Sequence, residues 1–357
     1  MMKHTRKTLR RFAASFLAVM LLAALAIVPA GAAGVTTGSS DASITSITVS
    51  KDVTTDGNTY APNTSFTIAV EEGQGGTFND GTTVQTALPG VEGGLTGTSL
   101  TFAPVVEDEN APEATYNQTG ALTVNIEAFA NSTPGIYHYV VKETAGTYDG
   151  IEYDGSVYDV YLYLMRTEEN VPYIGYAVCV KQNTGSVGTK SELTFTNNYN
   201  SHDVLVTKQV EGTFANMDET FTFTVKVDGH DGEYYKVEYS EDGTVYTTAL
   251  KSGDTLTLDG IMDDDYIHIY GLSKNDTYTV TETDSKGYTV TDTKDNANDK
   301  IVSGKATQDG ESYIVTNTKN ASTPTGIITT FAPYALMVVV AAAACFFFLR
   351  RRNAAED

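Results

Sequence analysis

Alternation of apolar and polar residues with a period of two recurs along the chain from about residue 44 to residue 317. Turn dipeptides such as Asp56-Gly57, Asp149-Gly150, Asp242-Gly243 and Asp309-Gly310 separate the runs, and no run shows sustained helical periodicity. Strands of this kind bury one face against a second sheet, so the pattern predicts an all-β fold of two tandem Ig-like β-sandwich domains. The predicted strands are Ile44–Val53, Phe66–Val70, Leu122–Ile126, Tyr137–Val141, Tyr158–Leu164, Tyr173–Val180, Leu193–Tyr199, Val204–Val210, Phe221–Val227, Thr255–Leu258, Tyr266–Tyr270, Tyr278–Glu282 and Tyr313–Asn317.

The predicted domain boundary falls near Asn198–Asp203, where the chain has no Gly/Ser-rich run. We expect one sandwich in residues 33–200 and another in residues 201–320, joined as a fairly stiff rod. The Gly-rich stretch Gly73–Gly97 is predicted to be a long loop of the first sandwich.

Both ends of the chain carry apolar runs with basic flanks. Basic residues precede the run Phe12–Val28, and Ala30-Gly31-Ala32 follows it, which predicts a secretory signal peptide in residues 1–32. Residues 321–357 hold the run Ile327–Leu349 and then three arginines. That run is long enough to span a bilayer, with the arginines on the cytoplasmic side.

Charge excludes one class of partner. Without the five basic residues of the signal peptide and the three arginines and two acids of the tail, the chain carries 15 basic and 43 acidic residues, a net charge of −28. A surface this acidic repels phosphate backbones, so nucleic-acid binding is not expected.

Cysteine usage excludes an intrachain disulfide in the exported part. Cys179 is the one cysteine between the two ends, because Cys345 lies in the C-terminal apolar run. Exported proteins commonly use disulfides, and this chain is expected to fold without one. Cys179 lies within the strand-like apolar run Ala177–Val180 and is predicted to be a buried thiol.

Three polar residues of the first sandwich lie on strand faces that are otherwise apolar. Because side chains alternate faces along a strand, Lys51, Glu143 and Asn197 are predicted to point into the core. The second sandwich repeats the order with Lys208, Glu282 and Asn317. The apolar residues that share these faces are Ile47, Val49, Val53, Tyr137, Tyr139, Val141, Leu193, Phe195, Tyr199, Val204, Val206, Val210, Tyr278, Val280, Tyr313 and Val315.

Burial of these groups predicts a reaction. A desolvated lysine becomes a neutral nucleophilic amine, and a desolvated glutamate stays protonated. Beside an asparagine amide, the amine can attack with loss of ammonia, which gives a Lys–Asn isopeptide bond. The glutamate would polarise the carbonyl and protonate the leaving amine. The alternative is a Lys–Glu ion pair at a strand edge beside an ordinary Asn.

On these residues the chain resembles the Gram-positive major (backbone) pilins of the FctA type. The segments that carry the resemblance are Tyr137–Glu143, Tyr153–Val160, Phe195–Tyr199, Val206–Lys208, Tyr278–Glu282 and Val315–Thr318. The resemblance implies a self-formed Lys–Asn bond with a catalytic glutamate in each domain, and subunits joined head to tail by a pilin sortase.

The C-terminal Pro324-Thr325-Gly326 is similar to the sorting signal of Gram-positive surface proteins, in which a sortase cysteine cleaves after the threonine and transfers the acyl group to an amine. Alternatively, the apolar run that follows is the anchor of a single-pass membrane protein. The resemblance also implies an acceptor lysine near the end of the first domain. Lys190, seven residues before Asn197, is the first candidate for that acceptor, and Lys181 is the second.

The predicted function is a structural shaft subunit of a covalent pilus at the cell surface, with the sortase, copies of itself, minor pilins and peptidoglycan as partners. The alternatives are a monomeric wall-anchored adhesin and an ancillary basal pilin. We expect no turnover enzyme, cofactor or metal site. Acidic clusters at Asp263-Asp264-Asp265 and Asp295–Asp299 lack the spacing of a calcium loop and are interpreted as solvated loops.

Overall fold

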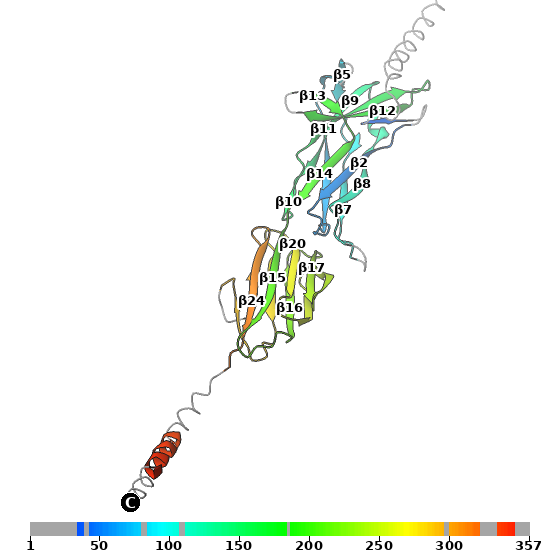
Figure 1. Cartoon of the computed structure of the whole chain (residues 1–357). Coiled ribbons are helices and arrows are strands. Elements are labelled where there is room, and N and C mark those ends of the chain that lie inside the picture. The colour runs from blue at the N-terminus through cyan, green and yellow to red at the C-terminus, as the bar shows by residue number, and fades with distance from the viewer. Residues whose placement is uncertain are drawn as a thin grey trace, which may run out of the picture.

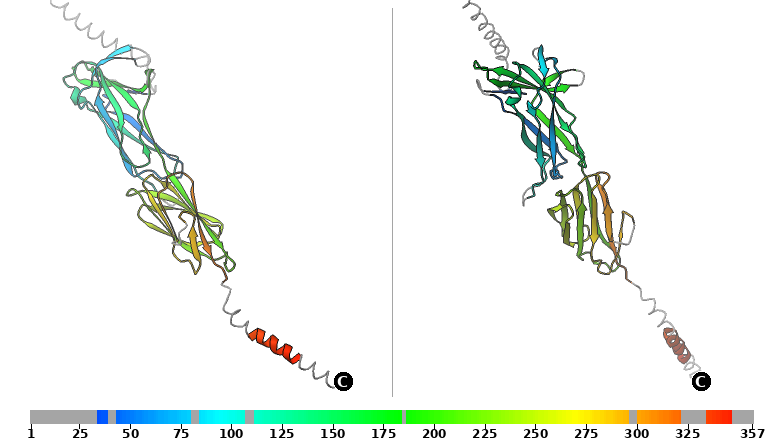
Figure 2. Two further views of the ribbon diagram at one scale, coloured as in Figure 1. Left: turned by 90° about the vertical axis from the view of Figure 1, so that its left-hand side faces the viewer. Right: turned by 180° about the vertical axis from the view of Figure 1, so that it is seen from behind.

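The computed structural model describes residues 34–38, 43–79, 84–106, 111–183, 186–295, 300–321 and 334–346. Apart from the 3-10 helix η1 (Ile126–Phe129) and a helix at 334–346, the regular elements of these residues are strands. The prediction of an all-β fold with two sandwiches in series is confirmed. Figures 1 and 2 show the sandwiches stacked end to end, with the helix beyond the second one.

The N-terminal sandwich, residues 34–199, packs two sheets around one core. The first sheet has the order β1-β12-β11-β9-β3-β7, with β13 beside β12 and the hairpin β4–β5 beside β9, and the second has the order β10-β14-β2-β8-β6. Strand β14 runs parallel to β2, which brings the end of the sandwich beside its beginning. The bounds are β1 (Val35–Thr37), β2 (Ser46–Thr54), β3 (Thr64–Glu72), β4 (Gly76–Asn79), β5 (Val84–Pro89), β6 (Leu95–Thr96), β7 (Thr98–Phe102), β8 (Thr115–Val124), β9 (Gly135–Thr144), β10 (Ile151–Glu152), β11 (Val157–Arg166), β12 (Pro172–Asn183), β13 (Ser186–Lys190) and β14 (Leu193–Tyr199).

The stretch Gly73–Gly97 was predicted to be a long loop, and this prediction is wrong. It contains β4, β5 and β6, and β5 pairs with β9 in parallel. Phe78 stacks on Tyr161 at 3.6 Å between ring centroids, on the outer face of the first sheet. A small second cluster of buried apolar residues lies there, so β11 is buried on both faces. Glycine and threonine in this short hairpin weaken its strand signal.

The C-terminal sandwich, residues 202–318, has one sheet of order β18-β17-β20-β15-β24-β22 and another of order β19-β16-β21-β23. Its first strand β15 runs parallel to its last strand β24. The hairpin β17–β18, which turns at Asp242-Gly243, was absent from the predicted strands. The bounds are β15 (His202–Glu211), β16 (Phe221–Asp228), β17 (Tyr234–Glu241), β18 (Thr244–Lys251), β19 (Thr255–Ile261), β20 (Tyr266–Leu272), β21 (Thr277–Glu282), β22 (Thr289–Asp292), β23 (Ile301–Gly304) and β24 (Glu311–Thr318).

The junction between the sandwiches is held by direct hydrogen bonds. Only two residues separate β14 from β15. Tyr148 and Tyr199 of the N-terminal sandwich donate to one oxygen of Glu233 at 2.6 and 2.9 Å. On the C-terminal side Tyr235 donates to the other Glu233 oxygen and to Asp276, at 2.9 and 3.1 Å. Both carboxylates are 2% exposed, so the junction contains two buried acids in contact with two buried tyrosines, Tyr199 and Tyr235, and with the half-buried Tyr148.

The predicted signal peptide and the sorting sequence Pro324-Thr325-Gly326 lie outside the described residues. Of the apolar run Ile327–Leu349, residues 334–346 are described, and they are helical. Within the part of the chain that the structure describes, no helix is both long and apolar enough to cross a membrane.

Two candidate cross-linking sites

The N-terminal site brings Lys51, Glu143 and Asn197 together between the two sheets. Lys51 on β2 and Asn197 on β14 belong to neighbouring strands, and Lys51 pairs with Phe195, two residues before the asparagine. Lys51 and Asn197 therefore point to the same face, and Glu143 on β9 meets them from the opposite sheet. Lys51 and Asn197 are fully buried, and so is the Glu143 side chain.

One carboxyl group bridges the other two side chains of this site. Lys51 Nζ lies 3.4 Å from Glu143 Oε2, and Asn197 Nδ2 donates to Glu143 Oε1 at 2.9 Å. The predicted nucleophile and the predicted leaving nitrogen thus contact different oxygens of the same acid.

The C-terminal site repeats this arrangement on β15, β21 and β24. Lys208 pairs with Val315, again two residues before the asparagine, Asn317. Lys208 Nζ lies 3.5 Å from Glu282 Oε2, and Asn317 Nδ2 donates to Glu282 Oε1 at 2.8 Å. All three residues are at most 1% exposed.

A phenylalanine covers the lysine in each site, and sequence reasoning missed both. Lys51 Nζ lies 5.0 Å from the ring centroid of Phe66, and Lys208 Nζ lies 4.4 Å from that of Phe221. Each phenylalanine lies two residues before the residue that pairs with the site's glutamate, on β3 and β16 respectively. The signal was present as Phe-Thr-apolar, at the start of β16 and two residues into β3.

Burial shifts the pKa values of Lys51, Glu143 and Lys208 toward the neutral form of each group. It lowers the pKa of Lys51 and raises the pKa of Glu143, although their mutual attraction opposes both shifts. Burial also lowers the pKa of Lys208 to about 8, against the attraction of Glu282. A neutral amine is the nucleophilic form of lysine, so the environment favours the reactive state.

The glutamates were predicted to polarise the asparagine carbonyl, and the geometry assigns them another position. In both sites the carboxyl faces the amide nitrogen. In the N-terminal site the carbonyl oxygen Asn197 Oδ1 instead accepts the backbone N–H of Asp154 at 2.7 Å. Sequence reasoning did not single out Asp154, which lies in the turn Asp154-Gly155 between β10 and β11.

The two candidate acceptor lysines lie on adjacent strands of the first sheet. Lys190 ends β13 and pairs with Val180, and it is half-buried. Strand β13 belongs to the first sheet, whereas β14, which carries Asn197, belongs to the second. Lys181 on β12 is also half-buried, with Nζ 5.6 Å from the centroid of the Tyr158 ring.

Two other predicted features are placed by the structure. Cys179 is 2% exposed, and burial raises the pKa of its thiol to about 12, so it is an inert core residue. The cluster Asp263-Asp264-Asp265 is not simply solvated. Asp265 is buried and accepts from Ser240 Oγ at 2.7 Å, and Asp263 accepts the Val210 N–H at 2.6 Å. These carboxylates close a turn against neighbouring strands.

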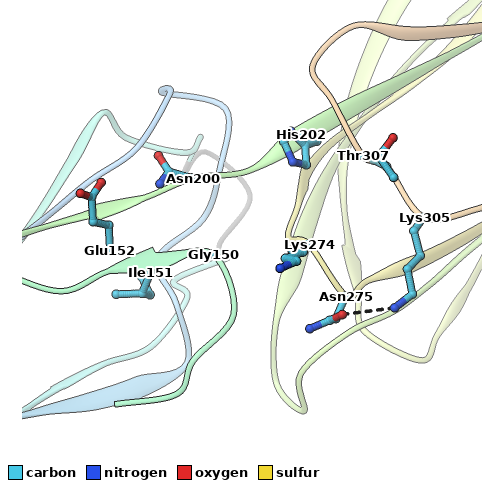
Figure 3. A pocket seen from close by; sticks show the side chains of 10 residues that line it. Gly150, Ile151, Glu152, Asn200, His202, Lys274, Asn275, Lys305 and Thr307 are labelled. Carbon is cyan, nitrogen blue, oxygen red and sulfur yellow. Dashed lines mark hydrogen bonds between the residues drawn. The ribbon is translucent and has the colours of Figure 1, made fainter. Parts of the chain in front are cut away.

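A cleft of about 830 Å³ lies where the sandwiches meet. Figure 3 shows Glu152 and Asn200 on its N-terminal side and Lys274, Asn275 and Lys305 on its C-terminal side. Lys305 Nζ donates to Asn275 Oδ1 at 3.2 Å. Among the described residues no group of three or more acids, histidines or cysteines is arranged to hold a metal ion.

Sequence comparison relates the chain to one named family and to a curated pilin. Residues 202–319 match the family described as Domain of unknown function (DUF7601). A protein named Pilin from Streptococcus pyogenes serotype M1 is 26% identical over 309 residues, which cover 81% of this chain and 85% of that protein.

Solved structures of streptococcal major pilins have the same fold. The major pilin T3.2 of Streptococcus pyogenes serotype GAS13637 superposes with a TM-score of 0.59 at 20% identity, covering 80% of this chain and 100% of that one. A second major pilin from Streptococcus pyogenes gives a TM-score of 0.55 at 22% identity, covering 77% and 98% respectively. The resemblance of this chain to Gram-positive backbone pilins of the FctA type, inferred from its Lys, Glu and Asn segments, is thereby confirmed.

Proposed function

We propose that this chain is the structural shaft subunit of a sortase-assembled covalent pilus, and that each sandwich cross-links itself without an enzyme. The observation that carries the proposal is the repeated site. Two sandwiches of different strand order place a lysine, a glutamate and an asparagine in the same register and at nearly the same distances.

The reaction is a single-turnover amide exchange. The lysine Nζ forms a bond to the asparagine Cγ, and the bond from Cγ to Nδ2 breaks. The glutamate takes a proton from Nζ at Oε2 and gives one to Nδ2 from Oε1, so ammonia leaves and the carboxyl group is regenerated. The cross-links are Lys51–Asn197 with Glu143, and Lys208–Asn317 with Glu282.

Such bonds suit a fibre under tension. The C-terminal bond joins the first and last strands of its sandwich, and the N-terminal bond joins β2, which follows the short β1, to the last strand; in both cases the joined strands are parallel neighbours. A pull on the chain ends then passes through the covalent bond and not through the hydrogen bonds of the sheet. By the loop-closure formula for disulfides, each bond removes about 5 kcal/mol of denatured-state entropy.

Assembly would use the predicted sorting sequence. A pilin sortase would cleave after Thr325 and transfer the acyl group to a lysine of the next copy, with Lys190 as the first candidate and Lys181 as the second. The last subunit would be joined to peptidoglycan, which places the protein at the cell surface. The similarity to proteins named as pilins supports this assignment.

Intact-mass spectrometry tests the cross-links. The full chain is expected to weigh less than its sequence by two ammonia molecules. Replacing either Glu143 or Glu282 by alanine should reduce the deficit to one. A mass equal to that of the uncross-linked chain would contradict the proposed reaction.

An immunoblot of wall extracts boiled in SDS tests assembly. A ladder of regularly spaced high-mass species is expected, and it should collapse when Lys190 is replaced. A ladder that responds only to Lys181 replacement would reassign the acceptor. A single wall-linked band of monomer mass would favour an anchored adhesin over a shaft subunit.

A further inference from the structure

We propose that the backbone N–H of Asp154 is the oxyanion donor of the N-terminal cross-linking reaction, and that the Asp154 carboxylate positions it. This inference rests on the proposed cross-linking function and adds a group that no strand of the site supplies.

The geometry assigns two separate tasks to two groups. The Asp154 N–H donates to Asn197 Oδ1 at 2.7 Å and, over a longer 3.1 Å, to Glu143 Oε2, whereas the amide nitrogen of Asn197 donates to Glu143 Oε1 at 2.9 Å. An N–H group can only donate, so this contact fixes which end of the amide faces which neighbour. When Lys51 attacks Cγ, the electron pair of the C=O bond moves to Oδ1, where the Asp154 N–H already points.

The Asp154 side chain ties this N–H in place. Its Oδ1 accepts the backbone N–H of Ser156, and its Oδ2 accepts that of Thr196, both at 2.7 Å. Burial opposes ionisation of Asp154, but these hydrogen bonds hold its pKa below the usual range. The turn between the two sheets is thus pinned to the residue immediately before Asn197.

The C-terminal site lacks this donor for a structural reason. There β22 pairs regularly with β24, with Val290 opposite Asn317 and Thr291 opposite Thr316. In the N-terminal sandwich the corresponding strand β10 ends at Glu152, opposite Asn198. Asp154 therefore lies beyond the paired residues of β10, and its N–H can donate to a side chain. Among the described residues, the buried Asn317 Oδ1 has no hydrogen-bond partner.

The direct test replaces the Asp154 N–H by an ester oxygen. The full chain is synthesised cell-free in detergent micelles with the α-hydroxy acid analogue of aspartate at position 154, which keeps the side chain. Samples are quenched at intervals, digested, and scored by mass for the Lys51–Asn197 and Lys208–Asn317 cross-linked peptides. The C-terminal cross-link in the same molecules is the matched control.

The expected result is an N-terminal reaction slowed by about 10²- to 10³-fold, the usual effect of losing one oxyanion donor, with an unchanged C-terminal reaction. Asp154→Ala keeps the N–H but loses its positioning bonds, so it should slow the same reaction less, and Asp154→Asn should restore part of the rate.

An N-terminal rate that the ester leaves unchanged, in chains that form both cross-links, would overturn the inference alone. Absence of both cross-links from the parent chain would overturn the proposed function, and the inference with it. An equal slowing of both reactions would show a general folding defect and would also contradict the assignment.

Discussion

The two cross-linking sites share the residues that lie on their strands and differ in a backbone N–H group that a turn contributes to one of them. In both, the lysine pairs with the residue two before the asparagine, a glutamate faces them from the other sheet, and a phenylalanine covers the lysine. The N-terminal site adds the Asp154 N–H to the asparagine carbonyl. Strand register therefore suffices to bring the lysine, the glutamate and the asparagine of each site together. The length of the neighbouring strand, β10 or β22, decides whether the carbonyl also has a donor.

The largest expected effect comes from removing the proton carrier of one site. Glu143→Gln and Glu282→Gln keep the shape and an acceptor for the asparagine amide, but they cannot transfer a proton. Each should abolish the cross-link of its own sandwich only. The free energy of unfolding of that sandwich should fall by about 5 kcal/mol, the loop-closure term of the missing bond.

The measurement is intact mass followed by urea unfolding of the full chain, with the untouched sandwich as the internal control. If Glu143→Gln stopped cross-linking and Glu282→Gln did not, the two sites would not share a mechanism. That result would contradict the inference that the same geometry gives the glutamate the same role in both sites.

Sequence patterns located the six residues of the two candidate sites because parity along a strand is a local property. Lys51, Glu143 and Asn197 interrupt apolar faces, and the order of the three recurs in the second sandwich. Which strands become neighbours is a long-range property, so the parallel pairing of β2 with β14 was not predicted. Phe66 and Phe221 looked like ordinary core residues, because only the three-dimensional register places them over a lysine.

Asp154 and the hairpin β4–β5 were missed for different reasons. Asp154 acts through its backbone N–H, which leaves no trace in residue type beyond the Asp-Gly turn. The hairpin covers an outer face that the alternation rule treats as solvent-exposed. The apolar character of both faces of β11 was the available signal, since Tyr161 and Tyr163 are buried outside the main core.

The second prediction tests whether the two sites belong to independently folding units. Asp276 in the junction cluster has its pKa raised to about 6 by burial and by the charge of Glu233. In the unfolded chain it would titrate near the ordinary value of about 4. The folded state therefore holds the proton to higher pH, so stability should fall as pH rises from about 4 to about 6. The expected loss is about 2 to 3 kcal/mol.

Asp276→Asn removes this titration and keeps an acceptor for Ser273 and Tyr235. We expect the variant to unfold at the same urea concentration as the parent below pH 4, and to be more stable than the parent at pH 7. Tyr148→Phe removes the hydrogen bond from Tyr148 to Glu233 across the junction. It tests whether the two sandwiches unfold together or whether the junction stabilises the C-terminal sandwich alone. If it changes the unfolding of both sandwiches, they are coupled through Glu233. A parent whose stability does not vary between pH 4 and pH 7 would contradict the proposed role of Asp276.

The smallest effect concerns the phenylalanine that covers each lysine. Phe66→Leu and Phe221→Leu keep an apolar side chain, so each should cost only about 1 to 1.5 kcal/mol of stability. Each should also slow its own cross-link, because water that reaches the lysine stabilises the protonated amine, which is not nucleophilic.

The two phenylalanines differ in how many aromatic rings hold them in place. Phe221 contacts Tyr288, whereas Phe66 contacts both Phe102 and Tyr153. Slowing should therefore be greater for Phe221→Leu, whose site also lacks a carbonyl donor. Time courses of the two cross-linked peptides measure this, with Phe129→Leu as a control, because Phe129 belongs to the same core and packs on Tyr137. A larger slowing from the control than from Phe66→Leu would show that packing, and not exclusion of water from the amine, sets the rate.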